Sequence, residues 1–530
     1  MSLQGIATAK DFHESTKLNY INLDTKPPLY KDYKQLPSIE LSRDLGLPTF
    51  PTVDAMSDWN NSITGNIDLG TVSKLLYYSA GIIRTANHPT AGEVHYRAAA
   101  SAGALYPVET YLLCQDLDGI EAGIYHFAPH EFALRQIRAG DYRRLLADAT
   151  AENQDILQSS ATLIFTTLFW RSTWKYRSRG YRYCYWDTGT MISNLLSTVA
   201  ACQVSARLIT GFIDSQVNAI LSIDGVEEST TCLVPLSGVT PLQPITSPPT
   251  LQRVDPDNLQ SHLPSLRYAD LEAVHSASLL STSKEVLDWR AKAASNQPKL
   301  LIQETTNCNT SDPGSRPLAQ TILNRGSTRR FTHDPIPLNQ FLTVIDNAIH
   351  CLPLDFSVSE LDTLVDLYVI VNSVDTLASG AYFYSIQEKR LDILKPGDFR
   401  DEAGHLGFEQ ALPADASAVF FFMADLEKVL NRCGSRGYRI AQMESGVLGG
   451  NLYLGMHSLG FGSTGLTFFD DEITEFFSPH AKNKSTLFVI PVGNKHSRNL
   501  VRPFRSKMAT KLDALARGAG HNLTQITDSK

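Results

Sequence analysis

The sequence of 530 residues lacks a long apolar stretch, a basic run and an apolar segment near its N-terminus. Its densest apolar stretch, around Ala416 to Ala424, is far shorter than the roughly 20 residues that a membrane helix needs. The net charge of −8 at pH 7 argues against nucleic acid as a main partner. Because a signal peptide is also missing, we expect a cytoplasmic protein that binds neither membranes nor nucleic acids.

Closely spaced cysteines and clustered histidines are absent as well. The seven cysteines are scattered and form no C-x-x-C pair, which argues against a disulfide or zinc framework. We expect reduced and mostly buried thiols. Because no histidine group has the spacing of metal ligands, the sequence predicts no metal site.

What the chain does contain is an internal repeat. Ser178–Arg182 recurs as Ser435–Arg439, and Tyr181 and Tyr438 are separated by 438 − 181 = 257 residues. The same offset aligns further pairs along more than a hundred residues, including Tyr111 with Tyr368, Gly123 with Gly380, Gly189 with Gly446, and Asn194 with Asn451. Two copies at so large a period indicate duplicated domains and not a solenoid.

Both copies show the same order of hydrophobic patterns: a helix, three strands, a long helix and a closing strand. In copy one these are expected at 69–83, 110–114, 123–127, 162–168, 181–202 and 231–236, and in copy two at 338–351, 367–371, 380–384, 417–423, 438–459 and 486–492. Strands and helices mix without strict alternation, so the predicted class is α+β. Small residues at Gly189 and Gly446 predict close packing of the long helices.

Composition suggests the domain boundaries. Prolines at the start indicate an extended arm over 1–60, followed by the first domain at 61–240. A proline-rich polar stretch over 241–318 is interpreted as a linker with short helices, and the second domain is expected at 319–530.

The two copies differ first in a loop of small residues. Helices align at an offset of 338 − 69 = 269, whereas strands align at 257, so copy one has twelve extra residues between them. We expect the excess around Arg97 to Pro107, which reads RAAASAGALYP. Its small residues would let backbone amides approach a flat ligand closely.

The second difference is a basic segment at the start of copy two. Arg325, Ser327 and Arg329 alternate, so in an extended segment they project to one side. Two guanidinium groups and a hydroxyl suit a phosphate monoester, which carries about −1.5 to −2 charges at neutral pH. The matching stretch of copy one, near Met56 to Asn61, has no basic residue. Each copy therefore contains a piece of a binding site that the other lacks.

These residues resemble a known family. The run R-x-x-x-S-A-G-A-L-Y-P, the later G-I-Y-H-F and the W-K-Y-R-x-R-G-Y-R-Y segment are similar to SagB-type dehydrogenases, within the flavin mononucleotide (FMN)-dependent nitroreductase superfamily. The R-x-S-x-R opening and the F-F-D-D-E closing of copy two resemble nitroreductase domains too. The resemblance implies two tandem three-layer α+β domains that form an intramolecular pseudo-dimer, with FMN between them and one FMN per chain.

The resemblance also implies which residues bind FMN. Arg325, Ser327 and Arg329 would bind the phosphate, with Lys495 or Arg498 completing that site. The isoalloxazine ring would be lined from copy one by Arg97, Ser101, Ala102, Gly103, Leu105 and Tyr106, and from copy two by the amides of Gly462, Ser463, Thr464 and Gly465. Two positions depart from the family pattern, Ala100 before the loop and Gly326 in the basic opening.

Lys175 and Tyr176 are the candidate catalytic residues. Copy two has Arg432 and Cys433 at these positions, so the pair is peculiar to copy one. It resembles the motif that azoline-oxidising relatives use for proton abstraction, and a lysine serves as a base where burial or nearby cations lower its pKa. The alternative is a solvated basic turn.

Several neighbouring residues are interpreted as structural. The aromatic residues between Phe165 and Trp186 and the strand residue His126 are assigned to packing. Asp187 and its counterpart Glu444 are expected to cap a helix or pair with arginine.

The resemblance leaves two substrate classes open for an FMN-dependent oxidoreductase. One is dehydrogenation of azoline rings in a modified peptide, and the other is NAD(P)H-driven reduction of small electrophiles such as nitro compounds, quinones or enones. A flavin-binding or scaffold protein with little turnover is the alternative. Because the tandem supplies its own pseudo-dimer, we expect a monomer, with further dimerisation possible.

Overall fold

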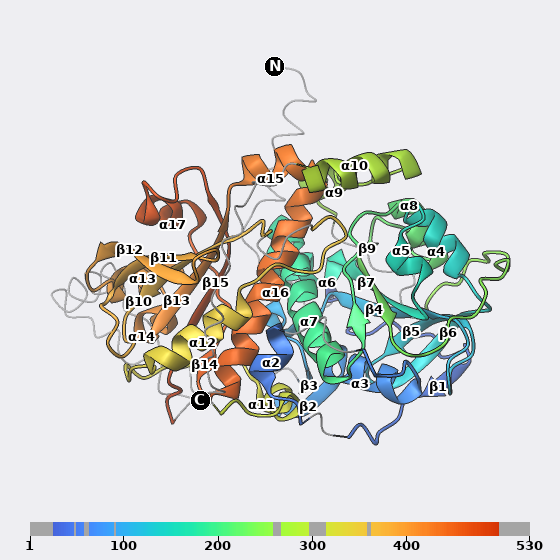
Figure 1. Cartoon of the computed structure of the whole chain (residues 1–530), viewed down its shortest axis with the longest axis horizontal. Coiled ribbons are helices and arrows are strands. Elements are labelled where there is room, and N and C mark those ends of the chain that lie inside the picture. Colours follow the sequence, from blue (N-terminus) through green and yellow to red (C-terminus); the bar gives the residue numbers. More distant parts are fainter. Residues whose placement is uncertain are drawn as a thin grey trace, which may run out of the picture.

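The chain folds into two halves on either side of a pair of long helices (Figure 1). The computed structural model describes residues 25–46, 49–57, 63–88, 92–257, 267–295, 314–357 and 362–497. One large cluster of buried apolar residues contains side chains from both sheets and both long helices. The halves therefore share a core.

Each half contains one large antiparallel sheet, and the two sheets have the same strand order except that β1 adds an edge strand to the first. The first sheet runs β1 (Ser38–Glu40), β6 (Ala133–Ala139), β5 (Gly123–Ala128), β4 (Val108–Cys114), β7 (Ala161–Leu168), β9 (Glu228–Ser237) and β8 (Ser205–Ala206). The second runs β12 (Arg390–Pro396), β11 (Gly380–Ser385), β10 (Asp366–Val371), β13 (Ala418–Ala424), β15 (Ser485–Gly493) and β14 (Gly462–Ser463). Central strands such as β4, β7 and β13 are buried along their whole length, and β13 accordingly has a continuously apolar sequence. The predicted duplication and the α+β class are confirmed.

The long helices α7 (Gly180–Ala201) and α16 (Arg436–Ser458) cross at two glycines. A Cβ atom built on Gly189 would lie 2.3 Å from the Met443 carbonyl oxygen and 2.6 Å from the Gly446 Cα. Only glycine permits so close an approach of two backbones. The predicted close packing of the long helices is confirmed.

The other helices cover the sheets and the linker. They are α2 (Thr52–Ser57), α3 (Leu69–Ala80), α4 (Arg143–Ala149), α5 (Gln154–Leu157), α6 (Phe169–Tyr176), α8 (Asp214–Ile220), α9 (Ala269–Ser276), α10 (Ser283–Ser295), α11 (Leu318–Asn324), α12 (Leu338–Ala348), α13 (Arg400–Leu406), α14 (Ala411–Asp415), α15 (Leu426–Cys433) and α17 (Asp470–Phe477). Of these, α9 and α10 belong to the segment between the two copies.

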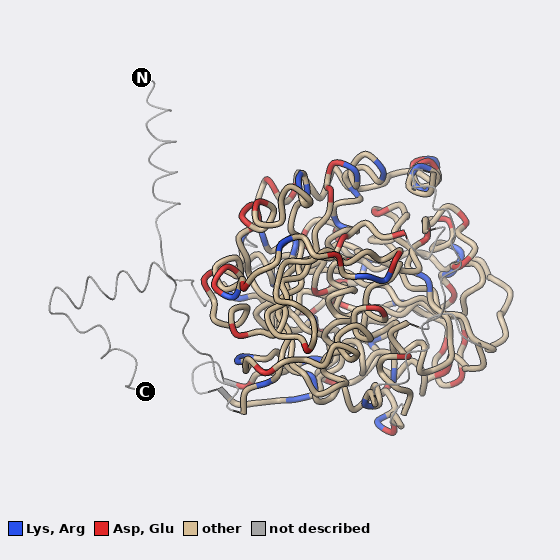
Figure 2. Tube along the Cα trace, turned by 60° about the vertical axis from the view of Figure 1, so that its left-hand side comes forward, with Lys and Arg blue, Asp and Glu red and all other residues tan. Residues whose placement is uncertain are grey.

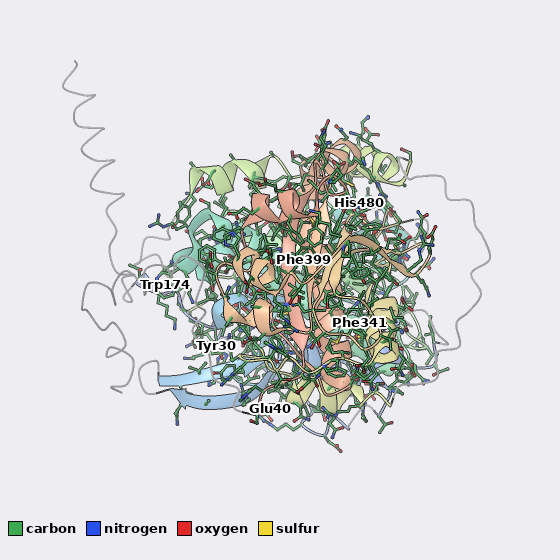
Figure 3. The ribbon with its side chains drawn as sticks, turned by 90° about the vertical axis from the view of Figure 1, so that its left-hand side faces the viewer. Tyr30, Glu40, Trp174, Phe341, Phe399 and His480 are labelled. Carbon is green, nitrogen blue, oxygen red and sulfur yellow. The ribbon has the colours of Figure 1, made fainter. Side chains whose placement is uncertain are left out.

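The extra residues of copy one form a β-hairpin, which corrects the expected position of the insertion. Strands β2 (Ile82–His88) and β3 (Gly92–Arg97) pair with each other in a sheet of their own, and Figure 3 shows them projecting from the body. Along the described residues between α12 and β10, copy two has no such hairpin. The loop from Arg97 to Pro107 follows the insertion and is not itself the excess.

None of the described helices is long and apolar enough to cross a membrane. Within the same residues, no group of three or more histidine, cysteine or acidic side chains could hold a metal ion. Figure 2 shows basic and acidic residues interspersed along the visible chain.

Candidate functional site

The loop Ser101–Tyr106, here called the ring loop, has an unusual backbone. Gly103, Ala104 and Tyr106 all have positive φ angles, of 64°, 53° and 48°. The left-handed conformation costs a non-glycine residue roughly 1–2 kcal/mol. Surrounding contacts must therefore hold the ring loop in this shape.

Two side chains of α7 hold the ring loop. The Asp187 carboxylate accepts hydrogen bonds from the Ser101 hydroxyl at 2.5 Å and from the Ala102 amide at 3.0 Å. One helical turn later, the Thr190 hydroxyl donates to the Ala100 carbonyl at 2.7 Å. Ser101 Oγ in turn accepts from the Tyr106 amide at 2.9 Å. The expectation that Asp187 caps a helix or pairs with arginine is wrong, because its carboxylate binds the ring loop.

Lys175 and Tyr176, at the end of α6, lie directly against the ring loop. A Cβ atom built on Gly103 would lie 2.6 Å from the Tyr176 hydroxyl and 3.1 Å from Lys175 Nζ. Burial, followed by nearby Tyr183 and Asp187, raises the pKa of Tyr176 to about 12. Tyr176 therefore keeps its proton at neutral pH and can donate a hydrogen bond. Lys175 is exposed.

The arginines near Lys175 are occupied elsewhere. Arg171 donates to Glu109 at 2.5 Å and to the Pro28 carbonyl at 2.8 Å. Arg179 donates to Asp470 at 2.8 Å. Both guanidinium groups are therefore paired with carboxylates.

The basic segment at the start of copy two extends across the end of its sheet. The Thr328 amide donates to the Ser463 carbonyl at 3.0 Å, and the Thr332 amide donates to the Asn494 carbonyl at 2.8 Å. Phe331 pairs with Lys495 as an antiparallel bridge. These contacts place the basic segment beside the Gly462–Gly465 turn and beside Lys495, whereas Arg498 lies outside the described residues.

Arg325 reaches from copy two to the ring-loop side of copy one. Its Nη2 and Nε atoms donate to the Ala98 carbonyl at 3.0 and 3.2 Å. Its guanidinium also lies 5.5 Å from the centre of the Tyr453 ring. The Tyr453 hydroxyl accepts a hydrogen bond from the Gly465 amide and lies within hydrogen-bonding reach of Ser327. Elements from both copies therefore meet at Arg325 and Tyr453.

Several buried polar atoms near the basic segment have no hydrogen-bond partner in the described part of the chain. They are Thr328 Oγ1, Ser463 Oγ and His457 Nε2. Burial, followed by Arg325, Lys495 and Arg316, lowers the pKa of His457 to about 3. Unpaired donors surrounded by cations fit the phosphate group of FMN.

Three further residues predicted to bind FMN, Arg97, Leu105 and Arg329, differ in their surroundings and in their exposure. Arg97 is buried between the rings of Tyr30 and Tyr106, with guanidinium-to-centroid distances of 5.4 and 5.1 Å. Its Nε and Nη2 atoms lack partners in the described residues. Leu105 is buried, whereas Arg329 is exposed.

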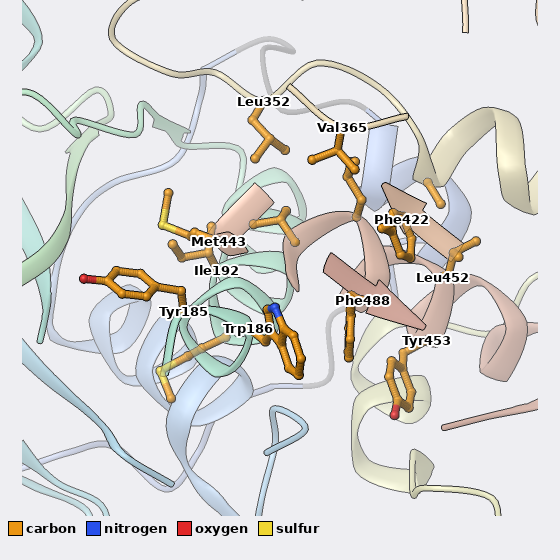
Figure 4. Close-up of a cluster of buried hydrophobic side chains, with 14 of the residues drawn as sticks. Tyr185, Trp186, Ile192, Leu352, Val365, Phe422, Met443, Leu452, Tyr453 and Phe488 are labelled. Atoms are coloured by element: carbon orange, nitrogen blue, oxygen red, sulfur yellow. The ribbon is translucent and has the colours of Figure 1, made fainter. Parts of the chain in front are cut away.

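Aromatic side chains connect the ring loop to the sheet of copy two. The rings of Trp186 and Phe488 stack with centroids 5.1 Å apart, and Figure 4 shows Tyr453 beside Phe488. A Cβ atom on Gly465 would lie 3.0 Å from the Phe488 ring. Tyr176, which lies against Gly103 of the ring loop, packs on Tyr183, and Tyr183 packs on Trp186, with ring centroids 4.5 Å apart in each pair. The ring loop and the Gly462–Gly465 turn thus approach a common aromatic cluster from opposite halves.

Asp187, Tyr453, His457 and Arg316 are site residues that the sequence reasoning missed. A signal existed for two of them, because copy one has Leu196 and Ala200 where copy two has Tyr453 and His457. Comparing the copies at every position, and not only at the matching motifs, would have found that difference.

The corresponding site on the other side of the molecule is filled by the chain itself. Leu354 forms a bridge with Leu208, whose counterpart by the offset of 257 is Gly465. The Asp355 carboxylate accepts from the Thr210 and Gly211 amides at 3.0 Å each. Arg432, the counterpart of Lys175, forms two hydrogen bonds to Asp362 at 2.6 and 2.7 Å. Contacts within the protein therefore occupy the positions that match the Gly462–Gly465 turn and Lys175.

Comparison with known proteins gives consistent matches. A profile of the Nitroreductase family matches residues 67–238 and 322–494, which together exceed half of the chain. A crystal structure of a protein from Anabaena variabilis described as a nitroreductase superposes with a TM-score of 0.70 at 24% identity, covering 92% of this chain and 99% of that one.

Sequence relatives match over shorter regions. MJ1384 of Methanocaldococcus jannaschii, described as a nitroreductase, is 27% identical over 24% of this chain and 65% of its own length. The microcin B17-processing protein McbC of Escherichia coli is 28% identical over 30% of this chain and 57% of its own length. The trifolitoxin-processing protein TfxB of Rhizobium leguminosarum is 26% identical over 43% of this chain and 70% of its own length. The chain thus spans less than two thirds of the length of the first two relatives.

Proposed function

The chain belongs to the nitroreductase family, and from that premise we propose that it is an FMN-dependent oxidoreductase with one FMN per chain. The observation that carries the proposal is the convergence of complementary elements from the two copies. Arg325 of copy two hydrogen-bonds to Ala98 of copy one, immediately before the ring loop. The opposite site is closed by contacts of Leu354 and Asp355, which supports a single cofactor.

FMN, when bound, supplies hydride transfer at its N5 atom. The chain's own residues would bind and orient it: Arg325, Ser327, Arg329 and Lys495 would hold the phosphate, with the unpaired Ser463 hydroxyl close to them. The small residues of the ring loop, Ser101, Ala102 and Gly103, allow the flat ring to approach the backbone. The Gly462–Gly465 turn bounds the ring from copy two.

Lys175 and Tyr176 are proposed to handle the substrate proton. Both side chains end at Gly103, so a substrate that lies against the flavin ring would contact them. Tyr176 would donate a hydrogen bond, because its hydroxyl stays protonated at neutral pH. Lys175 would accept or deliver the proton once a substrate covers it and removes water from its surroundings.

Two substrate classes follow from the relatives. McbC and TfxB are named as microcin B17- and trifolitoxin-processing proteins, which supports a modified-peptide substrate. The description of MJ1384 as a nitroreductase supports the other class, reduction of small electrophiles such as nitro compounds. We propose that the substrate is either a small molecule or a modified peptide, and experiment must separate these alternatives. We also propose that the chain is a monomer.

The first test is the colour and stoichiometry of the purified protein. We expect a flavin absorbance band and one FMN released per chain on denaturation. If the protein is a reductase, anaerobic addition of NADH or NADPH bleaches the flavin band. If it is an azoline dehydrogenase, its azoline substrate bleaches the band instead. A colourless protein that takes up no added FMN would refute the proposal.

The second test separates an enzyme from a flavin-binding scaffold. Lys175→Ala and Tyr176→Phe should abolish most turnover while retaining bound FMN. Lys428→Ala, an exposed lysine on the matching helix α15, is the control and should behave as the unmodified protein. Unchanged turnover in both site variants would favour the scaffold alternative.

A further inference from the structure

Asp187 and Ser101 form a hydrogen-bonded pair beneath the ring loop. Asp187 is 6% exposed, and its two oxygens accept from the Ser101 hydroxyl and the Ala102 amide. Ser101 Oγ simultaneously accepts from the Tyr106 amide. While Asp187 is ionised, the only proton of the Ser101 hydroxyl is therefore committed to the carboxylate.

Protonation of Asp187 reverses this arrangement. A protonated carboxyl donates to Ser101 Oγ, which then accepts from both Asp187 and the Tyr106 amide. Both lone pairs of the hydroxyl oxygen are then used, and its own proton is free to point away from α7. We propose that Asp187 and Ser101 form a proton-dependent switch in which protonation of Asp187 releases the Ser101 hydroxyl to donate to the bound flavin ring.

The switch rests on the proposed FMN site and works near neutral pH. Burial raises the pKa of Asp187 to about 7, although the hydrogen bonds from Ser101 and Ala102 act in the opposite direction. The neighbouring titratable groups are Tyr106 in the ring loop, Tyr176 on α6 and Cys184 on α7. Burial raises the pKa of all three, so they remain uncharged at neutral pH.

Two positively charged side chains also lie near the ring loop. Lys175 Nζ approaches Gly103 from α6, and the guanidinium of Arg325 approaches Tyr106 from copy two. Arginine keeps its charge throughout the physiological range. Asp187 is thus the carboxyl in contact with the ring loop that changes charge between pH 6 and 8.

Copy two contains a built-in comparison. Glu444 occupies the position that matches Asp187, and burial raises its pKa to about 8. Both of its oxygens accept from the Leu364 amide, at 3.0 and 3.2 Å, and within the described part of the chain no hydroxyl donates to this carboxylate. Titration of Glu444 therefore moves no hydroxyl proton toward a ligand.

The test is the pH dependence of FMN affinity, measured by quenching of FMN fluorescence between pH 6 and 8.5. For the unmodified protein we expect affinity to fall on the order of three- to tenfold as Asp187 ionises, the size of one net hydrogen bond. Asp187→Asn places an amide donor on Ser101 and should fix the high-affinity state at every pH. Ser101→Ala removes the donor and should fix the low-affinity state.

The controls distinguish this switch from other titrations. The FMN phosphate titrates in every variant, so the ratio of the FMN affinities of two variants at each pH isolates the effect of Asp187. Glu444→Gln should follow the unmodified protein. If the ratio of the FMN affinity of the unmodified protein to that of Asp187→Asn stays constant with pH, the switch is overturned but the proposed FMN site is not. If the unmodified protein binds no FMN, the proposed function fails and the switch fails with it.

Circular dichroism of each variant without FMN verifies folding. If Asp187→Asn does not fold, Ser101→Ala still decides the question, because the switch requires its FMN affinity to be independent of Asp187 ionisation. Retention of the full pH dependence in Ser101→Ala overturns the inference.

Discussion

At the scale of single residues, Gly103 sits where the catalytic candidates meet the ring loop. Its φ of 64° disfavours any side chain, and a Cβ atom would lie 2.6 Å from the Tyr176 hydroxyl. We expect Gly103→Ala to lose about 1–2 kcal/mol of folding free energy through backbone strain and most of its turnover through displacement of Tyr176. Urea unfolding and steady-state kinetics measure the two effects.

Gly434 provides the matched control. Its φ is 59°, and nothing lies within 4 Å of an added Cβ atom. Gly434→Ala should therefore show the same loss of stability without the loss of turnover. If Gly103→Ala and Gly434→Ala had equal turnover, the proposed contact of Tyr176 with the substrate would be contradicted.

Arg325 should contribute more to FMN binding than Arg329. Arg325 is directed at Ala98 and Tyr453 inside the site, whereas Arg329 is exposed. A charge-assisted hydrogen bond is worth about 1.5–3 kcal/mol, so Arg325→Gln should weaken FMN binding roughly 10- to 100-fold. Arg329→Gln should weaken it less. Fluorescence titration with FMN compares the two, and a larger effect of Arg329→Gln would refute the arrangement.

Residue types at the site could be predicted from the sequence only where they formed a motif. The ring loop and the basic segment were found because the matching stretches of the other copy have different residues. Asp187 was misassigned because a carboxylate beside arginines in sequence suggests ion pairing, while its actual partners, Ser101 and Ala102, lie 86 and 85 residues away. Contacts over such separations depend on the tertiary fold and leave no local signal.

At the scale of secondary-structure elements, the crossing of α7 and α16 fixes the distance between the halves. An alanine normally stabilises a helix relative to glycine by roughly 0.5–1 kcal/mol. At Gly189 we expect the opposite, because a Cβ atom would clash with the Met443 carbonyl. Overpacking of this kind costs about 1–3 kcal/mol. Urea unfolding of Gly189→Ala measures the loss.

The control is a helical glycine with space around it. A Cβ atom on Gly70, in α3, meets nothing closer than the Asp68 carboxylate oxygen at 3.4 Å. Gly70→Ala should be neutral or slightly stabilising. If Gly189→Ala were equally neutral, the two long helices could not be in backbone contact.

Elements with strong hydrophobic patterns were predicted to within a few residues, and the hairpin was not. Strand β13 (Ala418–Ala424) is wholly buried, so its sequence is continuously apolar. The middle of strand β2 is exposed, so residues such as Arg84 and Thr85 give it no apolar periodicity. The offset between copies revealed that twelve residues were inserted but not what they form.

At the scale of the whole molecule, each half binds the other through arginines of its repeated motif. Arg179 and Arg182 of copy one both donate to Asp470 of copy two. Arg436 and Arg439 of copy two both donate to Asp214 of copy one, at 2.7 and 2.9 Å. These arginines stand at or near the starts of the long helices, and only the tertiary fold reveals that they join the two halves.

The two ion clusters differ in burial, which gives opposite expectations for matched substitutions. The side chains around Asp214 are 1–2% exposed, whereas those around Asp470 are 29–31% exposed. Asp214→Asn leaves two buried arginines without their carboxylate and should cost about 3–5 kcal/mol. Asp470→Asn should cost no more than about 1 kcal/mol. Equal losses in urea unfolding would contradict the burial of the Asp214 cluster.

Acid should reveal the same asymmetry. Burial opposes the ionisation of Asp214, but Arg436 and Arg439 outweigh it and lower the pKa of Asp214 below its usual value. A carboxyl whose folded pKa is depressed adds stability that is complete above its unfolded pKa of about 3.9 and is lost as pH falls further. The unmodified protein should therefore lose stability steeply below about pH 4. Asp214→Asn, which has no proton to gain there, should show a shallower decline between pH 4 and 2 in urea titrations.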